Sequence, residues 1–190
     1  MQYNLVWTGI AYHSMENCLV TISQDHVYVT STVVGYHDGK PYQVNYRISA
    51  NTRWEIRSFH ITHRSGGKER DLDFFSVTPG IWTANGEPQP LLNGCVDIDI
   101  SLTPFTNTLP VKRLPWHNGK TQIVDVIYFD LLDFNIKRAQ QQYKQMSKNQ
   151  FHYTNLPNDF EALITVDDDG FVADYPQLFE RELKYVSEGS

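Results

Sequence analysis

The sequence has 190 residues and a formal net charge of -6, with 16 Lys and Arg against 22 Asp and Glu. This acidic balance argues against a nucleic-acid partner and against strong attraction to an anionic membrane surface. No apolar stretch approaches the roughly 18 residues that cross a bilayer, and the N-terminal region shows no secretory signal. We therefore expect one domain over residues 1–190, soluble and cytoplasmic, with no integral membrane segment.

The first half of the chain is predicted to be a β-meander. Two-residue alternation and β-branched residues recur in residues 3–8, 18–23, 27–36, 42–49 and 54–63. Asp38 and Gly39 supply the positive φ angles of a tight hairpin between the third and fourth of these runs. Two glycines in the segment 65–68 predict a second hairpin, which leads into a strand over residues 70–77, and residues 81–83 add a short strand.

The segment 94–114, GCVDIDISLTPFTNTLPVKRL, joins an acidic strand to a Pro-bracketed polar stretch. Asp97 and Asp99 are two positions apart, so they share one face of a strand, and the apolar residues between them share the other. From Thr103 to Pro110, rigid turn-forming residues surround short hydrogen-bonding side chains. These side chains either satisfy backbone groups where the strand turns or line a binding site. The residues alone favour the structural alternative.

The second half continues the sheet and is predicted to end in a helix. Residues 121–132 form a long central strand, and residues 136–147 form another, because no apolar face at helical spacing develops there. Further strands are predicted over residues 151–156, 162–166 and 171–173. Asp174 as a cap, Pro176 in the first turn and apolar residues at helical spacing up to Val186 then predict a C-terminal helix. The expected fold is mainly β, a curling antiparallel sheet packed on one helix.

The carboxylates of the acidic strand are the first candidates for chemistry. Asp97 and Asp99, joined by Asp125 or Asp130 from a neighbouring strand, could form a pair for acid–base catalysis. A solvated strand face is favoured instead, because exposed alternating charge is ordinary on antiparallel sheets. The candidate partners for ion pairs on that face are Arg57, Lys112 and Arg113.

The remaining polar motifs favour structural roles. The turn 167–170 (DDDG) lacks the further ligands of a calcium loop, so a plain β-turn is favoured. His60 and His63 fall on opposite strand faces, which does not suit a shared metal. Cys18 and Cys95 lie in apolar alternation and should be buried thiols, with a disulfide between them left open. No GxSxG, HExxH, P-loop or GxGxxG motif occurs, so we predict no cofactor, metal site or catalytic residue.

Spaced motifs over most of the chain resemble the putative glycolipid-binding family, a set of mostly bacterial proteins catalogued as a domain of unknown function. The resemblance runs from Trp7 to Phe179, and its most specific parts are LNGCVDID at 92–99, TPFTNTLP at 103–110 and Arg113. It implies a spiral β-roll, which is a half-open antiparallel barrel wrapped around a single α-helix and similar to bacterial lipoprotein-localisation factors. By that analogy an apolar cavity lies between sheet and helix, with the polar cluster near its mouth.

The resemblance implies binding of a glycolipid or other amphiphile, so an enzyme is the less favoured alternative. The predicted ligand-binding residues are Asp97, Asp99, Thr106, Asn107, Arg113 and Tyr143. In this hypothesis the polar side chains hold the head group and the sheet interior holds the tail. Recognition requires Thr106 and Asn107 to open toward the cavity rather than to close on their own backbone. Exposed sheet edges also allow a homodimer.

The alternative is a hydrolase or isomerase that acts on a small hydrophobic substrate. An Asp97 or Asp99 carboxylate assisted by Arg113 would carry the chemistry. This alternative gains if both aspartates point into a cavity with raised pKa values, and it loses if they face solvent or pair with surface cations.

Overall fold

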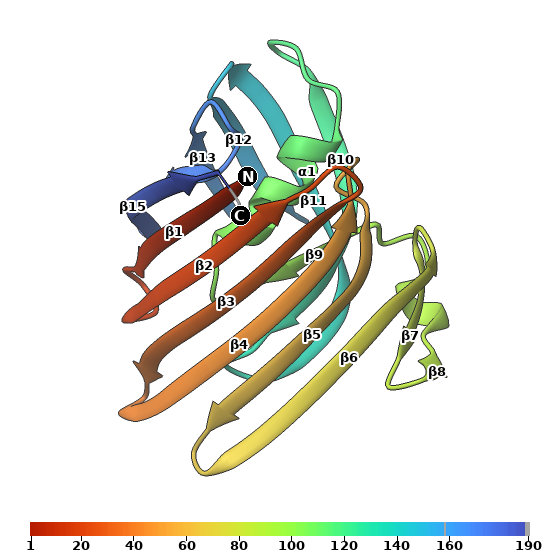
Figure 1. Cartoon of the computed structure of the whole chain (residues 1–190), viewed down its shortest axis with the longest axis vertical. Helices are drawn as coiled ribbons and strands as arrows, with labels where there is room; N and C mark the ends of the chain where they lie inside the picture. The colour runs from red at the N-terminus through yellow and green to blue at the C-terminus, as the bar shows by residue number, and fades with distance from the viewer. Residues whose placement is uncertain (158, 189–190) are drawn as a thin grey trace.

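Long antiparallel strands dominate the computed structural model, which describes residues 1–157 and 159–188. The first meander forms the broad curved face in Figure 1. Its strands are β1 (Gln2–Gly9), β2 (Ser14–Ile22), β3 (His26–His37), β4 (Lys40–Asn51), β5 (Ile56–Ser65), β6 (Lys68–Thr78), β7 (Ile81–Ala84) and β8 (Glu87–Pro88). The predicted meander is therefore confirmed.

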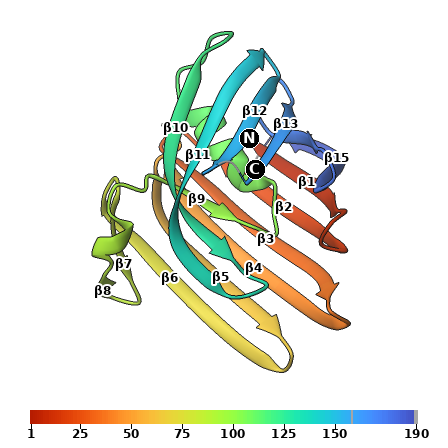
Figure 2. The same ribbon diagram turned by 180° about the vertical axis from the view of Figure 1, so that it is seen from behind.

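A second meander crosses behind the first, as Figure 2 shows from the other side. Its strands are β9 (Asp97–Ile100), β10 (Thr121–Asp130), β11 (Asn135–Ser147), β12 (Gln150–Leu156), β13 (Phe160–Val166), β14 (Val172–Tyr175) and β15 (Phe179–Ser187). The two meanders join where β1 pairs with β15, which gives one sheet in the order β8-β7-β6-β5-β4-β3-β2-β1-β15-β14-β13-β12-β11-β10-β9. Since β8 and β9 are the edge strands of this order, the roll is half-open.

The hairpins follow the turn chemistry of the sequence. Asp38 and Gly39 have φ angles of 48° and 71° and connect β3 to β4. Gly66 and Gly67, with φ angles of 57° and 73°, connect β5 to β6. Both residues of each loop need the left-handed region, which Asp-Gly and Gly-Gly pairs supply at low cost. Both predicted hairpins are confirmed.

The chain passes from β8 to β9 through the 3-10 turn η1 (Pro90–Leu92), and this link holds the two edges of the roll near each other. The backbone N–H of Gly94 donates to the carbonyl of Gly80 at 2.8 Å, and Trp82 Nε1 donates to the carbonyl of Cys95 at 2.7 Å. Strand β9 then pairs in parallel with β10. The strand predicted to be central is β10, which lies one place from the edge of the sheet because β9 is the outermost strand. A crossover that contains η2 and α1 connects β9 to β10, as parallel pairing requires.

The predicted C-terminal helix is wrong, because residues 172–187 form β14 and β15. Pro176 and Gln177, which has a φ of 68°, make a turn between them. Strand β15 then pairs with β1 along eight residue pairs. Leu183 and Val186, taken as part of a buried helical face, are 54% and 44% exposed. The hydrogen bonds offered by β1 override the fair helix propensity of this segment.

The single α-helix of the described residues lies in the middle of the chain. Helix α1 (Thr108–Arg113) follows the 3-10 turn η2 (Phe105–Asn107), and both belong to the Pro-bracketed segment. Figures 1 and 2 both show α1 inside the curl, between the two meanders. The expectation of a mainly β, half-open barrel wrapped around one helix is confirmed, with the helix placed centrally instead of at the C-terminus.

Two clusters of buried apolar side chains fill the roll. The larger one spans β1–β7, β9, the end of β10 and Phe105. The smaller one lies between β10–β15 and includes Tyr143 and Tyr153. Cys18 and Cys95 are both buried and both free. The prediction of buried thiols is confirmed, and the open alternative of a disulfide between them is wrong.

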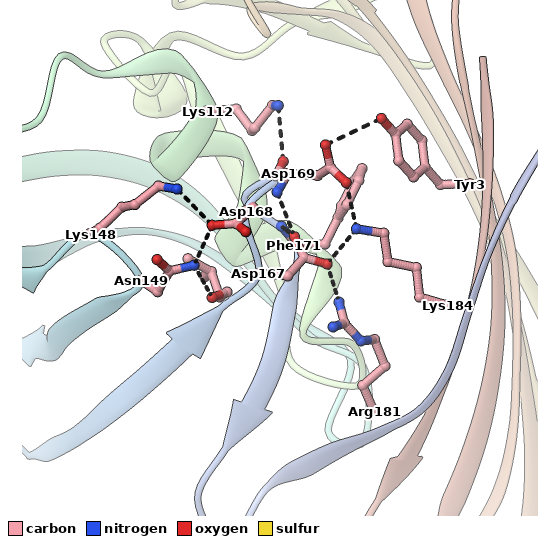
Figure 3. A network of polar contacts seen from close by, with 11 residues as sticks. Tyr3, Lys112, Lys148, Asn149, Asp167, Asp168, Asp169, Phe171, Arg181 and Lys184 are labelled. Atoms are coloured by element: carbon pink, nitrogen blue, oxygen red, sulfur yellow. Dashed lines mark hydrogen bonds and ion pairs between the residues drawn. The ribbon is translucent and has the colours of Figure 1, made fainter.

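The Asp167–Gly170 turn is an ion-pair centre that ties β15 to the loop before β14 (Figure 3). Asp167 accepts hydrogen bonds from the backbone N–H groups of Asp169 and Phe171, as in an Asx-turn. Its other oxygen pairs with Arg181 at 2.6 Å and with Lys184 at 2.8 Å. These contacts confirm a β-turn whose carboxylates are used by the chain's own cations.

We expect Asp167→Asn to lower the free energy of unfolding by about 2 kcal/mol, because it removes the charge that Arg181 and Lys184 share in a mostly buried position. Urea denaturation measures the change. Asp168→Asn is the matched control, since Asp168 is exposed and pairs only with Lys148 and Asn149. An equal loss in both variants would contradict a specific role for Asp167.

Candidate ligand-binding cavity

A cavity of about 470 Å³ lies at one end of the second meander. The ends of β10, β12 and β14 reach it, together with the starts of β11, β13 and β15. The β1–β2 turn contributes Tyr12. Ile100, at the end of β9, also lines the cavity, as do Ser101 and Thr103, which follow that strand. Strands and turns therefore build this cavity, whereas the resemblance implied an apolar space between sheet and helix.

Aromatic rings form a connected wall in this cavity. Its six members are Tyr12, Tyr128, Tyr153, Phe160, Tyr175 and Phe179. Ring centroids lie 5.3 Å apart for Tyr12 and Phe179, 6.1 Å for Phe179 and Tyr175, and 6.0 Å for Tyr175 and Tyr153. Phe160 adds a ring at 6.2 Å from Tyr153. Such spacings are typical of packed aromatic pairs, so five of the six rings form a continuous surface that is apolar in its ring faces, and Tyr128 adds a further ring to the lining.

Four hydroxyl groups on this wall are free to meet a ligand. Within the described part of the chain, Tyr12, Tyr128, Tyr153 and Tyr175 donate no side-chain hydrogen bond, and their hydroxyls are absent from the buried unsatisfied atoms. Burial, and after it the nearby charge of Asp99, raises the pKa of Tyr12 to about 12. These phenols stay protonated at neutral pH and can donate to a ligand.

Asp99 supplies a carboxylate to the same cavity. Gln141 Nε2 donates to its Oδ2 at 2.6 Å, and Thr106 Oγ1 donates to its Oδ1 at 3.1 Å. Thr106 in turn accepts the backbone N–H of Ile100, which leaves its own proton for Asp99. Burial raises the pKa of Asp99, and these two hydrogen bonds oppose that rise. The carboxylate is thus held as an acceptor, with no cation among its hydrogen-bond partners.

Asn107 and Thr103 both line the cavity and brace the Pro-bracketed segment. Tyr143 donates its hydroxyl to Asn107 Oδ1 at 2.8 Å, and Asn107 Nδ2 reaches the carbonyl of Pro104 at 3.4 Å. Thr103 Oγ1 accepts the backbone N–H of Phe105 at 3.0 Å. The sequence left open whether this segment braces the fold or opens toward a cavity, and it does both. Thr106 closes inward onto Asp99 and the backbone of Ile100, whereas Asn107 reaches the cavity.

Asp97 and Asp99 share one face of β9, as predicted, but that face is not solvated. Asp97 is 0% exposed and forms a bidentate pair with Arg113 of α1, with Nε–Oδ1 at 3.1 Å and Nη2–Oδ2 at 2.5 Å. The favoured hypothesis of a solvated face is wrong, because the segment after β9 folds back over it. Its expected partner Arg113 is correct, and neither residue of this pair lines the cavity.

The structure thus divides the predicted site residues into three groups. Asp99 and Asn107 line the cavity. Thr106 and Tyr143 hydrogen-bond to them from behind. Asp97 and Arg113 form a separate buried pair. Sequence reasoning missed Tyr12, Tyr128 and Tyr175 as wall residues, and Gln141 as the donor to Asp99.

Only some of the cavity residues that the sequence analysis missed could have been found from a sequence pattern. Tyr143 and Tyr153 are directly paired across β11 and β12, and their rings meet edge to face with centroids 5.2 Å apart, so strand pairing alone could have brought Tyr153 to the site. Tyr12 comes from a turn, and Tyr175 comes from the segment predicted to be helical. No local pattern connects these two residues with Asp99.

A further buried carboxyl group, Glu16 of β2, escaped the sequence analysis. Its Oε1 accepts hydrogen bonds from Ser31 at 2.7 Å, Tyr46 at 2.6 Å and Thr103 at 2.9 Å. Its Oε2 has no partner among the described residues. Burial raises the pKa of Glu16 to about 7, against the lowering effect of the three hydroxyls. Thr103 links this group to the cavity wall.

Among the described residues, no group of three or more His, Cys, Asp or Glu side chains gathers in a way that could hold a metal ion. His63 is buried, and the ring nitrogens of His60 lie 3.4 Å from Asp71 and 2.8 Å from Asp73 on the outer face. Within the same residues no helix has the length and apolar character needed to cross a membrane.

Both the sequence and the fold of this chain are similar to those of known proteins. Residues 4–181 match the family model described as "Putative glycolipid-binding". The fold is similar to the crystal structure of a DUF1089 family protein from Pseudomonas aeruginosa, with a TM-score of 0.77 and 30% sequence identity. That match covers 87% of this chain and 91% of the other. No curated protein matches the sequence.

Proposed function

Because this chain belongs to the putative glycolipid-binding family, we propose that its cavity binds a glycolipid or another amphiphile. The observation that carries the proposal is the lining of the cavity, where an aromatic wall meets the carboxylate of Asp99 and phenol groups that donate no hydrogen bond to another described residue. Ring faces suit the C–H surface of a sugar or an alkyl chain, and Asp99 and Asn107 suit its polar groups.

The size of the cavity fits a head group rather than a whole lipid. Its volume of about 470 Å³ lies near the lower end of the roughly 300–1,000 Å³ usual for small-molecule sites. The sheet interior, expected from the sequence to hold the tail, is filled by the larger core cluster. The tail therefore leaves along the apolar part of the lining, which Leu156, Phe160 and Leu178 provide.

The enzyme alternative finds no specific support in this geometry. Asp99 lines the cavity with a raised pKa, but Asp97 is paired with Arg113 outside it. Arg113, the proposed assistant of an Asp97 or Asp99 carboxylate, is thus engaged by Asp97 and does not line the cavity that contains Asp99. Binding without chemistry is the function that the site supports best.

Native mass spectrometry of gently purified protein tests the proposal. We expect a co-purifying species that adds the mass of a lipid or glycolipid and is lost on organic extraction. The extracted protein should bind a sugar-headed amphiphile such as dodecyl maltoside in a titration below its critical micelle concentration. Consistently empty protein that also fails to bind in this titration would contradict the proposal.

We expect Asn107→Ala to weaken binding of dodecyl maltoside by about fivefold, through loss of one hydrogen bond. The fold should persist, because Tyr143 keeps Gln141 Oε1 as a second acceptor at 3.3 Å. Thr108→Val is the matched control, since Thr108 Oγ1 is buried without a partner among the described residues and does not line the cavity. A large fall in Tm with unchanged affinity would show that Asn107 only braces the segment.

Three further expectations from the sequence stay predictions. We propose that the protein acts in the cytoplasm, does not bind nucleic acid and forms homodimers through an exposed sheet edge. Cell fractionation, a nucleic-acid shift assay and light scattering test them separately. A monomer at micromolar concentration would exclude the dimer.

A further inference from the structure

The charges around the cavity are unbalanced toward negative. Asp99, Asp130 and Asp159 are its acidic lining residues, and none of them forms an ion pair with another described residue. Asp130 accepts backbone N–H groups of Leu132 and Asp133, and Asp159 accepts from Asn155.

The cations on the lining do not offset this charge. Arg138 is bound to Asp125 at 3.1 Å and to the carbonyl of Asn93 at 3.0 Å, so its charge is already used. Lys137 remains as a single cation at the rim. A carboxylate removed from water without a cation is costly, and a cationic ligand would offset that cost.

The aromatic wall is arranged around the same carboxylate. Tyr12, Tyr128, Tyr153 and Tyr175 line the same cavity as Asp99, and after the larger effect of burial the Asp99 charge raises the pKa of each of these phenols. Ring faces carry negative potential and attract cations at distances within about 6 Å of the centroid. Lys137 already uses one of them, with its Nζ 5.7 Å from the centre of the Tyr128 ring.

We infer that the cavity selects an amphiphile whose polar end carries a cationic amine, which Asp99 neutralises and the tyrosine rings surround. An amino sugar and an alkylammonium head group share this chemistry. Gln141 and Thr106 fix the carboxylate by donating to both of its oxygens, so it meets the ligand as an acceptor and an anion. Anionic head groups, such as free carboxylates and sulfates, are excluded by the same charge. This inference rests on the proposed function of the cavity.

Three probes with the same dodecyl tail and different head groups test it. Calorimetric titrations below each critical micelle concentration would compare dodecyltrimethylammonium, dodecyl maltoside and dodecanoate. We expect the ammonium probe to bind the wild-type protein most tightly, by about tenfold or more over dodecanoate. Asp99→Asn should reduce its affinity by about tenfold and change that of the maltoside by less than about twofold. Asp168→Asn, which removes an exposed carboxylate far from the cavity lining, should change neither.

A second pair of variants reports on the rings independently of Asp99. Tyr128→Phe keeps the ring face and should bind the ammonium probe within about twofold of wild type, whereas Tyr128→Leu should lose about fivefold. Tighter binding of maltoside or dodecanoate than of the ammonium probe would overturn the inference and leave the proposed function standing. The inference would also be overturned if Asp99→Asn lost the same affinity for all three probes and if Tyr128→Phe and Tyr128→Leu bound the ammonium probe equally well. Failure of every probe to bind the wild-type protein would overturn both.

Discussion

Glu16→Gln should remove about 2.5 kcal/mol of the pH dependence of folding between pH 5 and pH 8. Glu16 is 2% exposed, and burial raises its pKa in the folded protein to about 7, above the usual value of 4.5. The folded state therefore holds the proton more tightly than the unfolded state. This contribution to stability is fully present below about pH 4.5 and is lost as the pH rises through 7. Gln stays neutral at every pH and cannot show the loss.

Urea unfolding of both proteins at pH 5 and pH 8 measures this effect as a difference of differences. The buried His63 has a lowered pKa, so its contribution to stability rises with pH instead. Because His63 is present in both proteins, its contribution cancels. Ser31→Ala is the control that keeps the carboxyl group. It removes one hydroxyl that lowers the pKa of Glu16, so its pH transition should move upward. The same pH slope in wild type and Glu16→Gln would rule out Glu16 as the titrating group.

Arg113→Met should lower the free energy of unfolding by about 3–5 kcal/mol, which is the cost of leaving a fully buried carboxylate without its cation. Asp97 is 0% exposed, and Arg113 engages both of its oxygens. Burial raises the pKa of Asp97, and the hydrogen bonds and charge of Arg113 oppose that rise. Without Arg113 the carboxyl group should bind a proton at higher pH, so the loss should be smaller in acid.

A double variant separates the cost of an unpaired charge from the loss of packing. Asp97→Val with Arg113→Met replaces the pair by apolar side chains of similar volume, which suits the buried strand β9. We expect this protein to lie within about 1 kcal/mol of wild type in urea unfolding. A double variant as unstable as Arg113→Met would show that α1 depends on the ion pair itself. A loss below about 1 kcal/mol in the single variant would contradict the buried-charge account.

Local chemistry accounts for the parts of the fold that the sequence predicted well. Asp38–Gly39 and Gly66–Gly67 adopt positive φ angles in two-residue loops at low energetic cost, so these two hairpins of the first meander follow from the loop residues themselves. The segment 136–147 lacks an apolar helical face and forms β11 as expected. Residues 174–186 have such a face and nevertheless form strands, because β15 pairs with residues of β1 that lie 170 or more positions away in the sequence.

The candidate site shows the same division between local and distant causes. Two-residue spacing puts Asp97 and Asp99 on one face of β9, but their different surroundings come from α1, β11 and the turn before β2. The sequence by itself determined the strand alternation, the tight turns and the motifs that mark the family. The tertiary structure alone decided which carboxylate pairs with Arg113 and which meets a tyrosine-lined cavity. The physical reason is that burial and charge pairing depend on strands brought together by the curl of the sheet, and no local spacing encodes that curl.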